Sequence, residues 1–182
     1  MMITLSLAAA ALLVGVDWLL KQLAIQYLSP VTTLPIWDGV LHLTYHENTG
    51  AAFSILRGHT ELLVAVTAVA LVAIVVFLLV KKPKSRFLVC SLALILAGGV
   101  GNLIDRLTQG FVVDYIDFRL IHFPVFNFAD CCAVIGTILL IGYLFFHDIY
   151  QVYRAKRAPQ PEAAEEEPST DAPPQEPPAP EA

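Results

Sequence analysis

The chain has 182 residues, of which 57% are hydrophobic and 15% are charged, and its mean hydropathy is +0.66. A soluble domain of this length holds about 45–50% apolar residues. The composition therefore excludes an ordinary soluble domain and indicates a membrane protein.

The formal net charge of -5 comes from the C-terminal end of the chain. Residues 158–182 hold seven of the sixteen acids and eight of the twelve prolines, and the rest of the chain holds nine acids against eleven bases. Nothing in this balance indicates a nucleic-acid partner. Because the segment has almost no large apolar side chains to offset its ordering entropy, we predict a disordered, acidic, Pro-rich cytoplasmic tail over 158–182.

Four apolar runs are long enough, or nearly so, to cross a bilayer, which takes about 20 helical residues. Only helices and closed barrels satisfy their backbone polar groups in lipid, and these runs are too long for strands. The predicted fold class is an all-α polytopic membrane protein with four transmembrane helices and a small β platform outside the membrane. The runs are roughly Ile3–Leu20, Leu62–Val80, Phe87–Ile104 and Phe128–Phe146.

The first run carries two charges near its far end, Asp17 and Lys21. Their i,i+4 spacing places both side chains on one helical face, where they can form an ion pair. Two interpretations stay open. The pair can cap the helix at the membrane surface, or it can support a buried site, since charges within a span usually face the protein interior.

The longest connection between the runs covers residues 29–60. Within it Leu41, Leu43 and Tyr45 alternate with His42 and Thr44, which is the period-2 pattern of a strand. We therefore predict a four-helix membrane domain over residues 1–157 with an extracytoplasmic platform over residues 29–60.

Basic residues gather on one side of the predicted spans. Lys81, Lys82, Lys84 and Arg86 lie within six residues between the second and third runs, whereas the 29–61 connection has a single base, Arg57. The positive-inside rule places the 81–86 loop and both chain termini in the cytoplasm. The far ends of the third and fourth helices then lie at the outer membrane boundary.

Two carboxylates fall at that boundary, Asp114 in the segment VVDYI and Asp130 in FNFAD. Unpaired carboxylates near hydrocarbon are costly. Two close carboxylates share a proton, so one can accept a proton from water while the other donates to a carbonyl oxygen. The pair predicts general acid/base hydrolysis without a metal, cofactor or serine or cysteine nucleophile.

Polar residues surround this pair in sequence. Gly98, Asn102 and Arg106 repeat at i,i+4 and share one helical face. Asn127 has the position of a helix N-cap with Asp130 in the first turn, so the FNFAD fragment alone is also explained by a simple helix start.

Five sequence blocks, in this order, resemble the bacterial lipoprotein signal peptidase (signal peptidase II) family over roughly residues 1–150. Each block alone is weak, but five in order with four spans are specific. They are DWLLK at 17–21, ENTGAAF at 47–53, GGVGNLIDR at 98–106, VVDYIDF at 112–118 and FNFAD at 126–130.

The resemblance implies a membrane aspartic endopeptidase of the cell inner membrane, with its active site at the periplasmic boundary. Its substrates would be diacylglyceryl-modified prolipoproteins in the lipid bilayer, cut just before the lipid-modified cysteine, and the cyclic peptide globomycin would inhibit it. The catalytic pair carries over to Asp114 and Asp130, and we expect a monomer. Motif positions that would bind substrate or support the pair are Asn48, Gly98, Asn102, Arg106 and Asn127, besides Asp17 and Lys21.

Other functions were weighed against this interpretation. Intramembrane Asp, Asn and Arg residues also occur in proton-coupled transporters, but the polar residues here cluster at one boundary and the four spans show no internal repeat. A non-catalytic adaptor that uses the acidic tail is the third possibility. The three cysteines and the dispersed histidines lack metal-site spacing, and we interpret them as packing and solvated residues.

Overall fold

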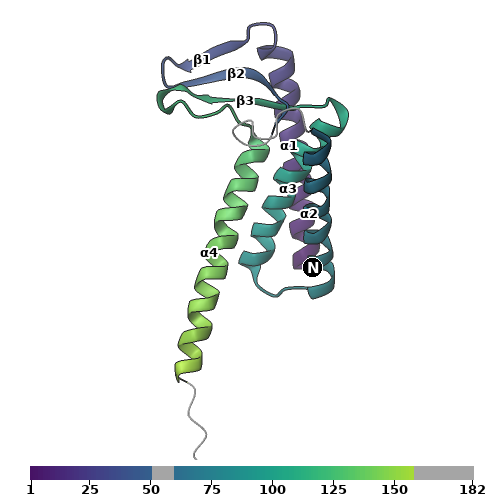
Figure 1. The fold of residues 1–182 in the computed structure, drawn as a ribbon, viewed down its shortest axis with the longest axis vertical. Helices are drawn as coiled ribbons and strands as arrows, with labels where there is room; N and C mark the ends of the chain where they lie inside the picture. Colours follow the sequence, from purple (N-terminus) through teal and green to yellow (C-terminus); the bar gives the residue numbers. More distant parts are fainter. Residues whose placement is uncertain (51–59, 158–182) are drawn as a thin grey trace, which may run out of the picture. The chain divides into compact units, whose positions relative to one another are not determined.

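The computed structural model describes residues 1–50 and 60–157, so the tail predicted over 158–182 lies outside the described residues. Residues 1–147 form one compact unit, which holds every element below except the end of the last helix. Each of the four long helices in Figure 1 has an apolar stretch sufficient to span a membrane, which confirms the predicted fold class. The helices are α1 (Met2–Leu28), α2 (Thr60–Lys81), α3 (Arg86–Thr108) and α4 (Phe128–Arg157).

Helix α1 continues to Leu28, past the end of the predicted span at Leu20. Asp17 and Lys21 lie inside this helix, and with Ala10, Ala24 and Leu28 they form its buried stripe. Their spacing of three, four and seven residues follows one face of a helix. The two charges compensate each other on that face, so they do not end the helix.

Helix α3 lies at the centre of the helical part of the fold. Of its apolar window 44% is buried, against 11% for α1 and α2. Val89, Leu92 and Leu96 form a cluster with Leu71 and Leu78 of α2. Glycines of α3 let its other two neighbours, α1 and α4, come close, because a residue without a side chain lets helix backbones approach each other.

A three-stranded antiparallel sheet lies at one end of the helices, next to the ends of α1 and α3 and the starts of α2 and α4 (Figure 1). Strands β1 (Thr33–Trp37) and β2 (Leu41–Asn48) lie within the predicted 29–60 platform. The third strand, β3 (Val112–Phe118), comes from the connection between α3 and α4 and pairs with β2. No strand was predicted there from the sequence, because Asp114 and Asp117 interrupt the apolar residues.

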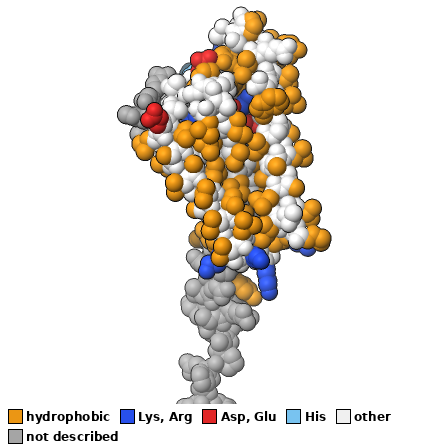
Figure 2. Space-filling view, turned by 90° about the vertical axis from the view of Figure 1, so that its right-hand side faces the viewer, with side chains coloured by type: hydrophobic (Ala, Val, Ile, Leu, Met, Phe, Trp, Pro, Cys, Tyr) orange, Lys and Arg blue, Asp and Glu red, His pale blue; other side chains and the backbone are white. Residues whose placement is uncertain are grey.

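The outward faces of the helices are apolar. Figure 2 shows hydrophobic side chains along one flank, with Lys and Arg side chains at the end remote from the sheet. Exposed residues such as Val69, Val72 and Val76 of α2 belong to such a face, whereas Lys81, Lys82 and Lys84 follow at the end of the same helix. The surface therefore has the pattern of a bilayer-spanning protein with one basic end.

Candidate active site

Asp114 lies on β3 with only 1% of its surface exposed. Both carboxylate oxygens accept a hydrogen bond from an amide group. Asn48 Nδ2, on β2, donates to Oδ2 at 3.0 Å, and Asn127 Nδ2 donates to Oδ1 at 2.7 Å. Burial, and then the negative charge of Asp130, raise the pKa of Asp114 to about 7, although both amide hydrogen bonds lower it. Asp114 therefore holds a proton far more readily than an ordinary aspartic acid.

Asn127 connects the two aspartates. Besides its bond to Asp114, its side-chain Oδ1 accepts the backbone N–H of Asp130 at 2.9 Å, and its own backbone N–H donates to Oδ2 of Asp130 at 3.1 Å. This reciprocal pair is a capping box at the start of α4. The helix-start interpretation of FNFAD thus holds, and the same cap also brings Asp130 beside Asp114.

Asn102 of α3 supports Asp130 from the other side. Its Nδ2 donates to Oδ1 of Asp130 at 2.7 Å. Its Oδ1 accepts from Lys21 Nζ at 2.9 Å and from Asn127 Nδ2 at 3.1 Å. Because the amide oxygen receives both donors, the Asn102 side chain is fixed in the orientation that offers N–H to Asp130.

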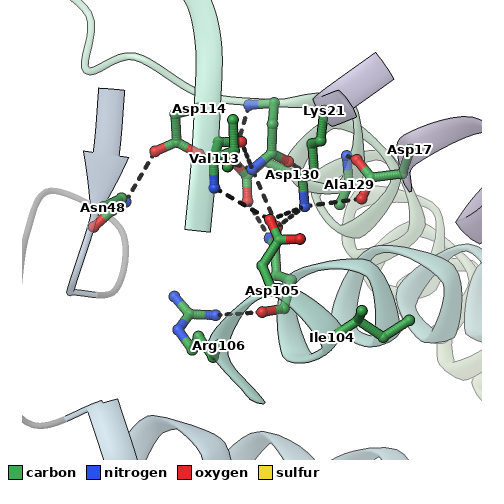
Figure 3. A network of polar contacts seen from close by, with 12 residues as sticks. Asp17, Lys21, Asn48, Ile104, Asp105, Arg106, Val113, Asp114, Ala129 and Asp130 are labelled. Carbon is green, nitrogen blue, oxygen red and sulfur yellow. Dashed lines mark hydrogen bonds and ion pairs between the residues drawn. The ribbon is translucent and has the colours of Figure 1, made fainter. Parts of the chain in front are cut away.

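Lys21 is the centre of a buried ion cluster (Figure 3). Its Nζ lies 2.8 Å from Oδ2 of Asp17 and 2.9 Å from Oδ2 of Asp105, and its side chain is 1% exposed. Asp17 Oδ1 accepts the backbone N–H of Ala129 at 2.9 Å, and Asp105 Oδ2 accepts that of Val113 at 3.1 Å. The cluster therefore fixes the two backbone segments that carry Asp130 and Asp114, and its burial does not fit a cap at the membrane surface.

Arg106, one turn beyond Asn102, contacts the chain that follows β2. Its Nη2 donates to the carbonyl oxygen of Gly50 at 2.7 Å, and Gly50 donates its N–H to Oδ1 of Asn48 at 2.9 Å. Arg106 Nε is buried and has no hydrogen-bond partner among the described residues. An open pocket of about 540 Å³ lies beside it, lined from α2 by Thr60, Glu61, Val64 and Ala65.

Gly98 has a packing role and makes none of the polar contacts above. A Cβ at this position would collide with the carbonyl oxygen of Ala129 and lie 2.7 Å from the backbone nitrogen of Ala133. Only glycine therefore lets α3 approach the first turns of α4. This approach brings Asn102 within reach of Asp130.

The structure thus brings all the predicted site residues into one region. Gly98 contributes by close helix packing, and Arg106 contacts the segment that follows Asn48. Asp105 belongs to the same network but was not among the predicted site residues. Two signals in the sequence could have identified it: its place in the block GGVGNLIDR, and its spacing of three residues from Asn102, which puts both on one helical face. Among the residues that the structure describes, no group of three or more His, Cys, Asp and Glu side chains could hold a metal ion.

The fold and site define a polytopic membrane protein with a paired-carboxylate centre at one end of its spans. The chain matches the family model described as signal peptidase (SPase) II over residues 9–146. It belongs to the signal peptidase II family.

Curated relatives and solved structures agree with this assignment. Lipoprotein signal peptidases from Brevibacillus brevis and Clostridioides difficile are 41% and 43% identical to the chain, covering 75% of it and 91% and 92% of their own lengths. A solved structure titled as a bacterial membrane enzyme at 1.9 Å resolution matches with a TM-score of 0.69 and 33% identity, over 78% of this chain and 92% of that one. Family membership and the four spans identify the protein as a multi-pass membrane peptidase.

Proposed function

We propose that this protein removes signal peptides from diacylglyceryl-modified prolipoproteins by cutting the peptide bond just before the lipid-modified cysteine. Asp114 and Asp130 form the catalytic pair. The observation that carries this assignment is that Asn127 contacts both carboxyl groups: its side-chain Nδ2 donates to Oδ1 of Asp114, and its backbone N–H donates to Oδ2 of Asp130. Family membership and the names of the relatives support the substrate class.

The pair acts by sharing one proton. Asp114, with its pKa raised to about 7 by burial and by the charge of Asp130, carries the proton and donates it to the scissile carbonyl oxygen. Asp130 is less buried and accepts a proton from the attacking water. The peptide bond then breaks from the tetrahedral intermediate as the amine nitrogen of the cysteine takes up a proton.

The supporting residues divide into two groups. Asn102, Asn127 and the ion cluster of Asp17, Lys21 and Asp105 orient the aspartates. Asn48 and Arg106 bind the substrate backbone, because Arg106 has a buried N–H donor without a partner among the described residues and lies beside an open pocket. We expect no cofactor, since all proton transfers use the two aspartates.

We further propose that the protein lies in the cell inner membrane with the sheet and the catalytic pair at the periplasmic boundary and both termini in the cytoplasm. The bases that follow α2, at the end remote from the sheet, support this orientation. A lipid-modified signal peptide could then enter laterally from the bilayer while water reaches the pair from the periplasm. We propose that the membrane domain extends over residues 1–157.

The decisive experiment is prolipoprotein processing by Asp114→Asn and by Asp130→Asn, each tested separately in reconstituted vesicles. We expect either variant to lose roughly 10³-fold or more in turnover while expressing normally. Asp38→Asn, at an exposed carboxylate on the β1–β2 turn, is the matched control and should keep full activity. Near-normal cleavage by either catalytic variant would refute the pair.

Inhibition by globomycin and a monomeric state remain part of the proposal. Inhibition by globomycin follows from the resemblance and is checked by an inhibition assay. The monomeric state is our own expectation and is checked by the mass of the detergent-solubilised protein. The alternative of a proton-coupled transporter gains no support from the family or the relatives.

A further inference from the structure

The turn between β3 and α4 exposes a run of large apolar side chains outside the membrane-spanning helices. We call Phe118, Leu120, Ile121 and Phe123 the apolar tip. Leu120 and Ile121 are each 66% exposed, Phe123 is 44% exposed and Phe118 is 37% exposed. Contiguous exposed apolar side chains of this size mark an interaction surface.

The tip is a well-defined turn. Residues Arg119–Ile121 form the short 3-10 helix η2, and His122 follows with a φ of 50°, which reverses the chain. The N–H of Phe123 then donates to the carbonyl oxygen of Phe118 at 3.2 Å. Backbone conformations of this kind are uncommon for residues other than glycine and persist only where the surroundings hold them.

Aromatic contacts fix the base of the turn. The ring of Phe126 stacks on that of Phe118 at 6.0 Å and meets Phe123 edge to face at 5.5 Å. Phe126 also exchanges backbone hydrogen bonds with Ile116 of β3. The turn therefore presents Leu120 and Ile121 outward from a rigid base.

The charged groups of this region are engaged on the sheet. Arg119 Nε lies 2.9 Å from Oδ2 of Asp117, and its Nη2 donates to Thr33 Oγ1 at 3.0 Å. Thr44 Oγ1 also donates to Asp117 at 2.7 Å. The outward side of the tip thus carries apolar side chains beside the imidazole of His122.

The tip adjoins the start of a membrane span. Phe123 is five residues before Phe128, the first residue of α4, so the chain between them reaches at most roughly 18 Å. Figure 1 shows this turn at the end of the sheet that is remote from α1, α2 and α3. Helix α4 itself exposes the apolar side chains of Val134, Ile135 and Ile138.

We propose that the apolar tip inserts into the interfacial region of the bilayer leaflet on the sheet side, with phospholipid as its partner. Its continuity with α4 and its lack of unpaired charge fit the boundary between headgroups and acyl chains. The same segment joins Asp114 to Asp130. Lipid contact at the tip would therefore hold the sheet, and Asp114 with it, at a fixed depth relative to the start of α4.

The test is a tryptophan placed at the tip of the full-length protein in vesicles. The two native tryptophans are replaced by Trp18→Phe and Trp37→Phe, and Ile121→Trp is added. In phosphatidylcholine brominated on the upper acyl chain, we expect its fluorescence to fall at least about two-fold, and aqueous acrylamide to quench it weakly. Asp38→Trp in the same background is the control, and should respond to acrylamide and not to bromine.

Two results would overturn the proposal. One is a tryptophan at position 121 that acrylamide quenches as readily as the one at position 38, with no response to brominated lipid. The other is protection from both quenchers together with cross-linking between two copies of the chain, because it would place a second copy on the tip. Neither readout depends on peptidase activity, so they stay informative if the proposed catalytic pair is wrong.

A kinetic measurement adds the functional consequence. Leu120→Ser combined with Ile121→Ser should raise KM for a vesicle-embedded prolipoprotein several-fold and leave kcat nearly unchanged, because no group of the catalytic pair is altered. An unchanged KM in a variant with an unchanged melting temperature would count against any role of lipid contact in positioning the site.

Discussion

Asn127 and Asp130 exchange two hydrogen bonds at the first turn of α4, one from each backbone N–H to the other's side-chain oxygen. The exchange uses the Oδ1 of Asn127 and leaves its Nδ2 group to donate to Asp114. A common helix-capping arrangement therefore sets the relative position of two carboxyl groups that lie sixteen residues apart in the chain.

Asn127→Ala and Asn127→Ser should separate capping from bridging. Alanine removes both functions, whereas serine keeps the cap but cannot reach Asp114. We expect both variants to lose most activity, and alanine to be less stable than serine by about 1 kcal/mol. Turnover and melting temperature in the same detergent are the measurements, and an active serine variant would show that the bridge is dispensable.

Lys21→Met should be strongly destabilising. The substitution leaves Asp17 and Asp105 buried without a cation, which costs roughly 3–5 kcal/mol for a buried pair. Lys84→Met, at an exposed base in the loop after α2, is the control and should change stability little. The check is denaturant unfolding of both variants, and equal stabilities would mean that the buried cluster contributes nothing.

The local sequence pattern was sufficient to predict the four spans, because the length of an apolar run alone identifies a membrane-spanning helix. It did not predict β3. The alternation in VVDYIDF is masked by its aspartates, and the strand exists because β2, more than sixty residues earlier in the chain, supplies its hydrogen bonds. The role of Asp105 was missed for a related reason, since its partner Lys21 lies on another helix.

Motif spacing placed Asp114 and Asp130 at the same boundary, but it could not define their contacts. The structure shows that Asn102 and Asn127 provide these contacts. Lys21 fixes the orientation of the Asn102 amide, and the backbone N–H of Asp130 fixes that of Asn127. Amide orientation depends on tertiary neighbours, so no local sequence pattern specifies it.

Gly98→Ala should destabilise the protein by roughly 1–3 kcal/mol. The added methyl group would meet backbone atoms of Ala129 and Ala133, which cannot move without shifting α4. Gly142→Ala, at a helical position where a Cβ meets nothing within 4 Å, is the control and should be neutral or slightly stabilising. The measurement is the melting temperature, with processing activity as a second readout, and an indistinguishable pair of variants would contradict the close helix packing.

Asp114→Asn should change how stability depends on pH. The folded-state pKa of Asp114 is about 7 against an ordinary value of 3.8, because of burial and then Asp130. The folded state therefore binds the proton more tightly than the unfolded state does. Below pH 3.8 the Asp114 carboxyl group is protonated in both states and does not change the free energy of unfolding. Between pH 3.8 and about 7 it lowers the free energy of unfolding progressively. The stability of the variant relative to the natural chain should increase from pH 4 to pH 8.

Melting temperatures across that range test this sign, with Asp38→Asn, at an exposed carboxylate, as the control. A flat difference for Asp114→Asn would mean that the carboxyl group is not perturbed in the folded protein.

Asn48→Ala should move the basic limb of the pH profile of kcat/KM. If the pair must hold one proton, activity falls as pH rises through the pKa of Asp114, which burial and then the charge of Asp130 raise to about 7. Burial and Asp130 raise the pKa of Asp114, whereas the hydrogen bond from Asn48 lowers it. Without that bond the pKa rises further, so the remaining activity should persist to higher pH.

The profile is measured from pH 5 to 9 on a lipopeptide substrate, which separates the position of the limb from the overall loss of rate. Glu47→Gln alters a neighbouring exposed charge on β2 and should leave the limb in place. A limb that stays fixed or moves to lower pH in Asn48→Ala would show that Asp114 is not the group that carries the catalytic proton.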